Sequence, residues 1–334
     1  MVNGHLSSET NVISGIPQGS VLGPLLFVLY INDLPGGLDC HAFMFADDTK
    51  VLNRIQDQND SIRLQNDLHR LESWSRKWLL SFHPDKCKVL TLGKHHNIPH
   101  AYPYCLFGVQ LEHIFEEKDL GVIIDADMVF EDHIAAKVKK ANAIMGLIRH
   151  VFTFMDKEMF SKLYTSLVRS HLEFSQNVWA PSSRKLIRLV ESVQIRATKF
   201  VEGLSDLDYA QRLEALDLTT LAYRRKRGDM IETWKHINVY SPDTFPACFK
   251  LCERPIRAST GRHSFQLYKP LASDGINGCQ ANSFYYRITD LWNRLPGEVV
   301  SAQTLNTFKN RLDSHWKHDP LKYDYTTLWE AEDD

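Results

Sequence analysis

The sequence predicts an α+β fold in which short strands come first and a helical bundle follows. Short apolar runs flank the adjacent aspartates Asp47 and Asp48, as in a β-hairpin. Apolar residues then recur at helical spacing in four segments between residues 134 and 237. The chain has 334 residues and is 43% hydrophobic, so it can bury cores of this kind.

Charge is distributed unevenly along the chain, although the formal net charge is only −2. Residues 1–125 hold about 10 basic and 15 acidic side chains, and residues 126–240 hold about 18 and 14. An acidic first part suits a metal site, and a basic helical middle could follow a phosphate backbone. Ordinary solvated surfaces would give the same counts, so both interpretations remain open.

The composition indicates an intracellular protein that does not cross a membrane. The longest apolar run, Val21–Ile31, contains Gly23 and Pro24 and is too short to span a bilayer. No basic segment followed by an apolar core marks a secretory signal. The six cysteines are scattered through a long chain, so we expect reduced thiols.

The first elements are predicted in chain order from apolar patterns. Residues 21–32 form either a strand or a buried helix, because a continuous apolar run does not separate the two. Residues 42–45 and 50–52 form the two strands of the hairpin. A helix starts near Ile62, capped by Asp60 or Ser61, because the apolar positions between 64 and 78 share one helical face. Residues 88–92 and 119–125 form short strands, and residues 93–104 form a loop.

The second half predicts a helical bundle. Four apolar stripes support helices over about residues 134–148, 160–174, 186–200 and 221–237. The last of these carries the basic run Arg224–Arg227, which we interpret as a solvated helix face rather than a phosphate contact or a localisation signal. After residue 241 the sequence is irregular until a final helix near residues 304–316.

Asp47 and Asp48 are the residues that carry chemistry. Polymerases transfer nucleotides with two Mg²⁺ ions roughly 3.5–4 Å apart, and Mg²⁺ prefers oxygen ligands. Adjacent side chains on extended backbone point to opposite faces, so the pair needs a further carboxylate from a neighbouring strand. The four residues Phe45–Asp48 alone would favour an ordinary turn.

The segment SGIPQGSVLGPLLFVLYINDLP (residues 14–35), followed by FADDTKVL (residues 45–52), resembles the reverse transcriptases of non-LTR (LINE-type, jockey-like) retrotransposons. The resemblance implies that Asp47 is a metal ligand and a catalytic residue. It implies that Asp48 is the less directly coordinated neighbour in the same site. The cofactor it implies is Mg²⁺.

The same resemblance implies a nucleotide and template site at Gly15, Pro17, Gln18, Gly19 and Ser20. The small residues would let the backbone approach nucleic acid closely, as glycine allows in general. Gln18 matches the family residue that lies near the nucleotide and the template base.

Two further motifs follow. SFHPDKCKVLTLG (residues 81–93) resembles the next palm motif, in which Lys86, or alternatively Lys88, would protonate the pyrophosphate leaving group. DLGVIID (residues 119–125) resembles the primer grip and assigns Leu120 and Gly121 to the primer end. Residues 133–152 resemble the start of the thumb.

The resemblance implies three regions: a partial reverse transcriptase palm over residues 1–125 with a small antiparallel sheet, a helical thumb-like region over 126–240, and a mixed C-terminal region with an acidic tail over 241–334. The implied function is RNA-directed DNA polymerase activity, with an RNA template, a DNA primer and dNTP as partners. A nuclear location would follow from the family.

The metal site is expected to be incomplete in this chain. Only 13 residues precede Ser14, and Glu9 is the one carboxylate among them, whereas the family takes another aspartate from an upstream strand. We therefore expect a truncated copy that is inactive alone. The alternative is a non-catalytic nucleic-acid-binding remnant that uses the helical middle.

Overall fold

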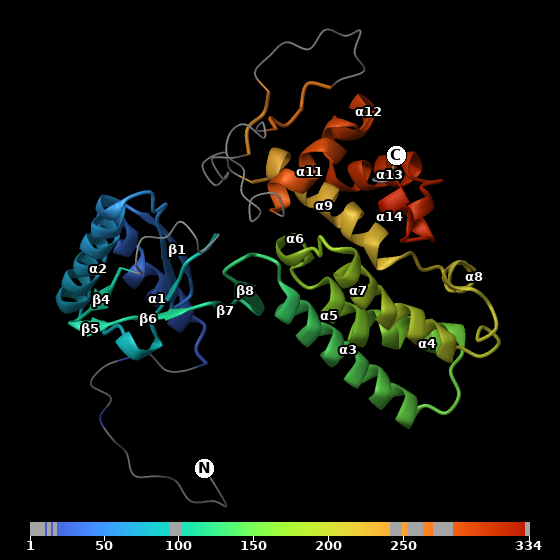
Figure 1. Cartoon of the computed structure of the whole chain (residues 1–334), viewed down its shortest axis with the longest axis horizontal. Coiled ribbons are helices and arrows are strands. Elements are labelled where there is room, and N and C mark those ends of the chain that lie inside the picture. Colours follow the sequence, from blue (N-terminus) through green and yellow to red (C-terminus); the bar gives the residue numbers. More distant parts are fainter. Residues whose placement is uncertain are drawn as a thin grey trace, which may run out of the picture. The chain divides into compact units, whose positions relative to one another are not determined.

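The computed structural model describes residues 11, 15, 19–93, 102–240, 249–252, 263–269 and 283–330. The chain divides into two compact units, of which unit 1 holds residues 1–89 and 97–114 and unit 2 holds residues 90–96 and 115–334. Helices and short strands occur together (Figure 1), so the α+β class is confirmed. The division at residues 125 and 240 remains a prediction.

Unit 1 combines one long helix with short strands. Its elements are α1 (Leu22–Ile31), η1 (Leu34–Gly37), β1 (His41–Phe45), β2 (Asp48–Leu52), α2 (Gln58–Trp78), η2 (Pro84–Lys86), β3 (Lys88–Leu90), β4 (Cys105–Leu106), β5 (Val109–Gln110) and β6 (Glu112–Ile114).

Unit 2 begins with a hairpin and is otherwise helical. Its elements are β7 (Glu116–Asp119), β8 (Val122–Asp125), α3 (Glu131–Val151), α4 (Lys157–Leu163), the π-helical segment η4 (Tyr164–Arg169), α5 (Ser170–Glu173), α6 (Gln176–Trp179), α7 (Arg184–Ala197), η5 (Thr198–Phe200), α8 (Tyr209–Ala215), α9 (Leu221–Asn238), α11 (Phe284–Asn293), α12 (Gly297–Val300), α13 (Leu305–His315), η9 (Pro320–Lys322) and α14 (Thr327–Glu330).

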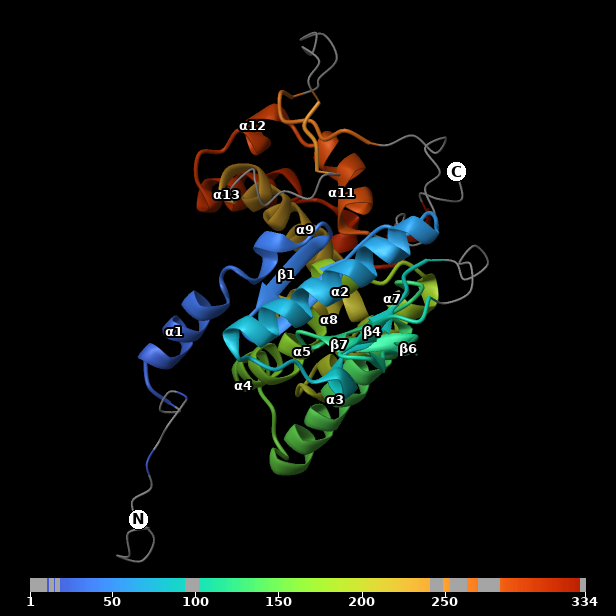
Figure 2. The same cartoon turned by 90° about the vertical axis from the view of Figure 1, so that its left-hand side faces the viewer.

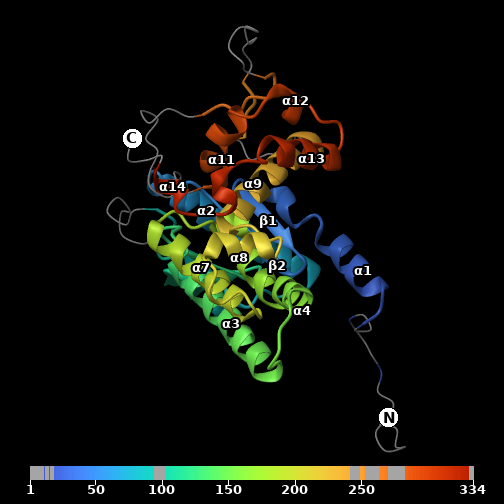
Figure 3. The same cartoon turned by 90° about the vertical axis from the view of Figure 1, so that its right-hand side faces the viewer.

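The apolar run near the N-terminus is a helix, α1. Pro24 falls in its first turn, where a missing N–H is tolerated, and the amide of Gly23 donates to Ser20 Oγ at 3.1 Å. Most of the apolar side chains of α1 are exposed, including Leu25 (57%) and Leu29 (64%). Figures 2 and 3 show α1 projecting from the rest of unit 1. No helix in the described ranges has both the length and the apolar character needed to cross a bilayer.

Helix α2 starts earlier than predicted, and the predicted cap is wrong. Asp57 is the N-cap residue, and its side chain accepts from the amides of Asn59 and Asp60. Asp60 lies at the third helical position, and its carboxylate accepts from the Asp57 amide, which completes a capping box. The sequence contains two aspartates three residues apart, and the capping box uses both.

The strands of the described residues pair only two at a time: β1 with β2, β3 with β6, β4 with β5, and β7 with β8. Helix α2 supports the β4–β5 hairpin with side chains. The amide group of Gln65 bonds both the N–H and the C=O of Cys105, at 2.8 and 2.9 Å. Glu72 accepts from the Phe107 amide at 2.6 Å. The two side chains therefore satisfy backbone groups of the β4–β5 hairpin that do not bond to another strand.

The predicted strand over residues 119–125 is confirmed for residues 122–125, which form β8, and is wrong for residues 119–121, which end β7 and form a turn. Asp119 is the last residue of β7, and β8 begins at Val122. Leu120 and Gly121 between them have φ of +43° and +84°, as a two-residue type I′ turn requires. These two positive φ angles interrupt the extended backbone and reverse the direction of the chain.

The apolar stripes predicted near residues 134–148, 186–200 and 221–237 are confirmed, because these segments form α3, α7 and α9 of unit 2. Figure 1 shows α3 and α7 side by side, and α9 packs on α7, α11 and α13. One core cluster lies among α3, η4 and α7, and a second lies among α9, α11 and α13. The expectation of irregular structure between residues 241 and 304 is wrong for residues 284–293, which form α11 with Ile288 and Trp292 fully buried.

The stripe predicted over residues 160–174 is wrong beyond its first turn. The buried residues recur every fourth position, at Phe160, Tyr164, Val168 and Leu172, whereas Leu167 and Phe174 are exposed. The π-helical segment explains the change, because its i→i+5 hydrogen bonds widen each turn, so that residues four apart stay on one face.

The basic run Arg224–Arg227 is not a solvated face, so that interpretation is wrong. Arg224 pairs with Glu173, Lys226 with Asp319 at 2.5 Å, and Arg227 with Asp313 at 2.6 Å. Arg225 is buried. Three of the four cations therefore connect α9 to its neighbours inside unit 2, and the fourth is buried.

A buried carboxylate lies at the start of α9. Glu191 has no exposed surface and accepts from Tyr209 Oη at 2.5 Å and from the amides of Leu221 and Ala222 at 3.0 and 3.3 Å. Burial raises the pKa of Glu191, and the opposing influences are the charge of Arg225 and these hydrogen bonds. The charge of each residue therefore reduces the energetic cost of burying the other.

We predict that Glu191→Ala lowers the free energy of unfolding by about 4 kcal/mol, because it removes the largest charge that compensates buried Arg225 and leaves the Tyr209 hydroxyl and two backbone amides without their acceptor. Denaturant unfolding of the full chain measures this. Glu158→Ala removes an exposed carboxylate paired with Lys162 and is the matched control, with an expected change below about 0.5 kcal/mol. Equal effects of the two substitutions would contradict the assignment.

Candidate functional site

The predicted hairpin is confirmed, and it presents both aspartates at its tip. Phe45 pairs with Asp48 across the strands, so Ala46 and Asp47 form a two-residue turn. Ala46 has φ of +53°, the sign that the first residue of a type I′ or II′ turn requires. Asp47 lies in the turn, Asp48 is the first residue of β2, and both side chains are exposed.

The two carboxylates fit part of a divalent-metal site. They are hard oxygen donors on adjacent residues, and within the described ranges no hydrogen bond or ion pair engages them. No group of three or more His, Cys, Asp or Glu side chains in the described residues is placed to hold a metal ion. The described residues therefore place no third side chain of these types beside Asp47 and Asp48.

Asp67 of α2 fixes the start of this hairpin. Its carboxylate is fully buried and accepts from the amide of Asp39, at 3.0 and 3.1 Å, and from the amide of Cys40 at 2.7 Å. Strand β1 begins at the next residue. Arg70 adds an ion pair with Asp67 at 2.7 Å and also contacts Asp39. The base of the hairpin is therefore held by a helix side chain.

Asp67 is charged in the folded chain. Burial raises its pKa, but hydrogen bonds from the Cys40 thiol, from two backbone amides and from Arg70 outweigh burial and bring it below its ordinary value. The same contact, together with burial, raises the pKa of Cys40 to about 12, so this thiol remains protonated. Sequence reasoning missed Asp67. The available signal was its position on the face of Leu64 and Leu71, where an isolated carboxylate needs buried partners.

The other residues predicted in unit 1 are only partly tested. Pro17 and Gln18 lie outside the described residues. Gly15 and Gly19 have φ of +92° and +83°, which explains glycine at both positions. Ser20 accepts from the Gly23 amide at the start of α1.

Neither lysine proposed as a proton donor is placed against the aspartates. Lys86 is an exposed residue of η2, and no interaction in the described ranges joins it to Asp47 or Asp48. Lys88 lies on β3 and forms an ion pair with Glu112.

The predicted primer-grip residues form the turn of the β7–β8 hairpin in unit 2. A Cβ atom at Gly121 would lie 3.2 Å from the Phe174 ring, so this turn packs closely against the end of α5. Leu120 is exposed beside it. Glycine is needed here for both its positive φ and its lack of a side chain.

Positive charge gathers near this turn. The Lys137 ammonium group lies 5.2 Å from the centroid of the Phe174 ring. Burial, then Lys140 and Lys118, lower the pKa of Lys137, and burial, then Lys140 and Lys137, lower the pKa of His171. We call Lys118, Lys137, Lys140 and His171 the turn-side basic patch.

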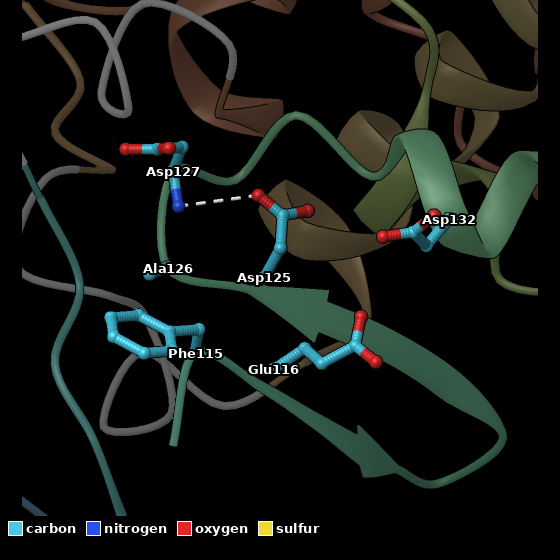
Figure 4. A pocket seen from close by; sticks show the side chains of 6 residues that line it. All are labelled: Phe115, Glu116, Asp125, Ala126, Asp127 and Asp132. Atoms are coloured by element: carbon cyan, nitrogen blue, oxygen red, sulfur yellow. Dashed lines mark hydrogen bonds between the residues drawn. The ribbon is translucent and has the colours of Figure 1, made fainter. Parts of the chain in front are cut away.

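The open end of the same hairpin is acidic. A pocket of about 390 Å³ lies there, and Figure 4 shows Glu116, Asp125, Asp127 and Asp132 among the side chains that line it. Asp125 has a local structural role, because its oxygens accept from the amides of residues 127, 129 and 130 at 3.2, 3.0 and 2.5 Å. These bonds hold the turn that leads into α3.

Residues 1–124 match the family described as reverse transcriptase (RNA-dependent DNA polymerase). The chain is 25% identical over 210 residues to the probable RNA-directed DNA polymerase from transposon X-element of Drosophila melanogaster, covering 59% of this chain and 23% of that protein. It is 27% identical over 219 residues to the RNA-directed DNA polymerase from mobile element jockey of Drosophila funebris, covering 60% and 23%.

A third similar protein is the RNA-directed DNA polymerase from mobile element jockey of Drosophila melanogaster, 30% identical over 215 residues, with 60% of this chain and 23% of that protein covered. The matched part thus spans about a quarter of the length of these relatives. No solved structure matches the chain.

We predict that Asp67→Asn lowers the free energy of unfolding by about 3 kcal/mol at pH 7, because it removes the charge and leaves hydrogen-bond donors unpaired. The folded pKa of Asp67 is depressed, so its stabilisation is complete above the unfolded pKa near 4 and is lost as the pH falls below it. Urea unfolding at pH 7 and at pH 3 measures both effects.

Asp85→Asn, at an exposed carboxylate of η2, is the control for this substitution. If Asp67→Asn is no more destabilising than Asp85→Asn at pH 7, Asp67 does not hold the hairpin.

Proposed function

We propose that this chain, which contains a LINE-type reverse transcriptase domain, forms part of the polymerase site of an RNA-directed DNA polymerase. The substrates would be an RNA template, a DNA primer and dNTP. The observation that carries the proposal is the exposed turn with Asp47 and Asp48, free of internal partners in the described ranges and located inside the matched family region.

Asp47 and Asp48 would hold divalent metal, with Mg²⁺ as the ion that suits two carboxylates and the phosphates of a nucleotide. Bound there, Mg²⁺ would activate the primer 3′-hydroxyl and neutralise the triphosphate. The protein's own contribution is to fix the hairpin, and the bonds from Asp67 to residues 39 and 40 support this role. The finer arrangement, a palm followed by a thumb, belongs to this proposal.

We also propose that the chain alone does not extend a primer. The support is that no third carboxylate in the described ranges joins Asp47 and Asp48 in a metal-binding group. A nuclear location belongs to the same proposal and rests on the family alone.

The second candidate function is nucleic-acid binding without catalysis. The turn-side basic patch favours it, because cations and the exposed Phe174 ring lie together there. Arg224–Arg227 do not favour it, since three of these residues are paired internally and Arg225 is buried. The binding surface of this candidate is therefore on α3 and α5 rather than on α9.

We predict that the purified chain with Mg²⁺, a primed RNA template and dNTP gives no more incorporation than Asp47→Ala, because its ligand set is incomplete. Primer extension on a denaturing gel measures this. Template-dependent extension that Asp47→Ala abolishes would contradict the predicted inactivity and support catalysis by this chain.

Metal binding itself can be followed without activity. Mn²⁺, a paramagnetic substitute for Mg²⁺, should bind the chain weakly and lose most of that binding in Asp47→Asn with Asp48→Asn. Asp85→Asn should leave Mn²⁺ binding unchanged. If the double substitution has no effect, these aspartates are not metal ligands.

We predict that Lys137→Gln with Lys140→Gln weakens binding to an RNA–DNA hybrid about tenfold near 0.1 M salt. The slope of log affinity against log salt should fall by about 1–2, because up to two phosphate contacts are lost. Fluorescence anisotropy at several salt concentrations measures both quantities.

Lys157→Gln with Lys162→Gln on α4 removes the same charge elsewhere in unit 2 and is the control. Equal weakening by both pairs would mean that net charge, and not the turn-side basic patch, determines binding.

A further inference from the structure

The β7–β8 hairpin is too small to keep its own orientation. Each strand has four residues, and no third strand pairs with them in the described part of the chain. The position of the Leu120–Gly121 turn therefore depends on contacts between the hairpin and the helices behind it.

The register of the hairpin points the backbone donor of Ile123 in β8 outward. Asp119 and Val122 flank the two-residue turn and exchange hydrogen bonds, so the next pair, Lys118 and Ile123, is a non-hydrogen-bonded pair. The Ile123 amide faces away from β7. It donates instead to Nδ1 of His133 on α3, at 3.1 Å.

His133 is itself held rigidly. Only 1% of its surface is exposed, and its ring lies 5.3 Å from the ring of Trp179. Trp179 Nε1 donates to the carbonyl oxygen of Phe174 at 2.6 Å. The Phe174 ring is the group that a Cβ at Gly121 would touch.

These contacts form a closed circuit: Ile123 to His133, His133 to Trp179, Trp179 to Phe174, and Phe174 back to the turn. The circuit holds the hairpin at two places, in the middle of β8 and at the turn. A hairpin held at two places cannot rotate about either contact.

The chemistry of His133 fits this role better than a packing role. Since Nδ1 accepts a hydrogen bond, the neutral ring carries its proton on Nε2, and Nε2 is buried with no partner in the described ranges. An apolar ring would avoid that unpaired donor. Burial and Lys137 lower the pKa of His133 to about 4, so the Nδ1 acceptor persists at neutral pH.

We propose that His133 is a positioning residue that, with Trp179 and Phe174, fixes the Leu120–Gly121 turn for contact with the primer strand. This inference rests on the proposed polymerase function for the identity of the ligand. The fixing of the hairpin rests only on the contacts above.

The test compares two substitutions of His133. Asn places an amide oxygen near the position of Nδ1, and Phe keeps the ring and its contact with Trp179 but has no acceptor. Amide hydrogen exchange at neutral pH should be about tenfold faster for residues 122–125 in His133→Phe. It should be clearly slower in His133→Asn than in His133→Phe, because Asn restores the acceptor although it lacks the ring that contacts Trp179. Exchange in α7 and α9 should not change in either. His150→Phe, at an exposed position of α3, is the matched control and should leave the hairpin unchanged.

The same variants are then assayed for binding to an RNA–DNA hybrid with a recessed primer end. His133→Phe should bind several-fold more weakly while the chain stays folded, and His133→Asn should restore part of the affinity. Equal exchange in the Phe and Asn variants, or faster exchange spread over all of unit 2, would overturn the positioning role. If exchange behaves as expected but the wild-type chain does not bind the hybrid, the role of His133 in fixing the hairpin is supported and the proposed function is contradicted.

Discussion

The structure depends on one constraint: a two-stranded sheet leaves half of its backbone polar groups facing away from the partner strand. Such groups need other partners. In this chain the partners are helix side chains. Asp67 accepts a hydrogen bond from the backbone just before β1. Gln65 and Glu72 accept from the backbone of β4 and of the turn after it. His133 accepts from the backbone of β8. Both hairpins that carry predicted functional residues are therefore oriented by helices, and a change within a helix can displace either of them.

The bundle of unit 2 relies on compensation of buried charge. Glu191 and Arg225 are both buried, and Asp229 forms an ion pair with Arg287 at 3.0 Å. Removing one member of such a pair costs far more than the pair contributes. The basic run Arg224–Arg227, which could contact phosphate as judged from the sequence, instead forms ion pairs within unit 2 or is buried there. Counting cations along a sequence does not distinguish the two uses, because their partners are distant in the chain.

Much of the fold could be predicted from the sequence, since long apolar stripes survive in α3, α7 and α9. The exceptions have physical causes. A π-helical segment shifted the buried face after Leu163, and a stretch rich in glycine and proline obscured the stripe of α11. The apolar run at residues 21–32 had no polar positions from which a period could be measured.

The candidate site was only partly predictable. Motif resemblance singled out Asp47, Asp48, Leu120 and Gly121. All four lie within residues 1–124, which match the reverse transcriptase family, and their individual roles remain predictions. Asp67 and His133 were not predicted, because their roles come from hydrogen bonds to the backbone amides of Cys40 and Ile123, which lie 27 and 10 residues away in the chain. No local pattern encodes contacts of that kind.

The β7–β8 hairpin also has an electric polarity. Lys118 and Lys137 lie at its turn, and the four carboxylates around the pocket lie at its open end, about 13 Å away for four residues of strand. The Debye length in physiological salt is about 8 Å, so each end acts locally. A polyanion that approaches is attracted at the turn and repelled at the open end. The field of the hairpin would therefore favour contact between a polyanion and the turn over contact with the open end.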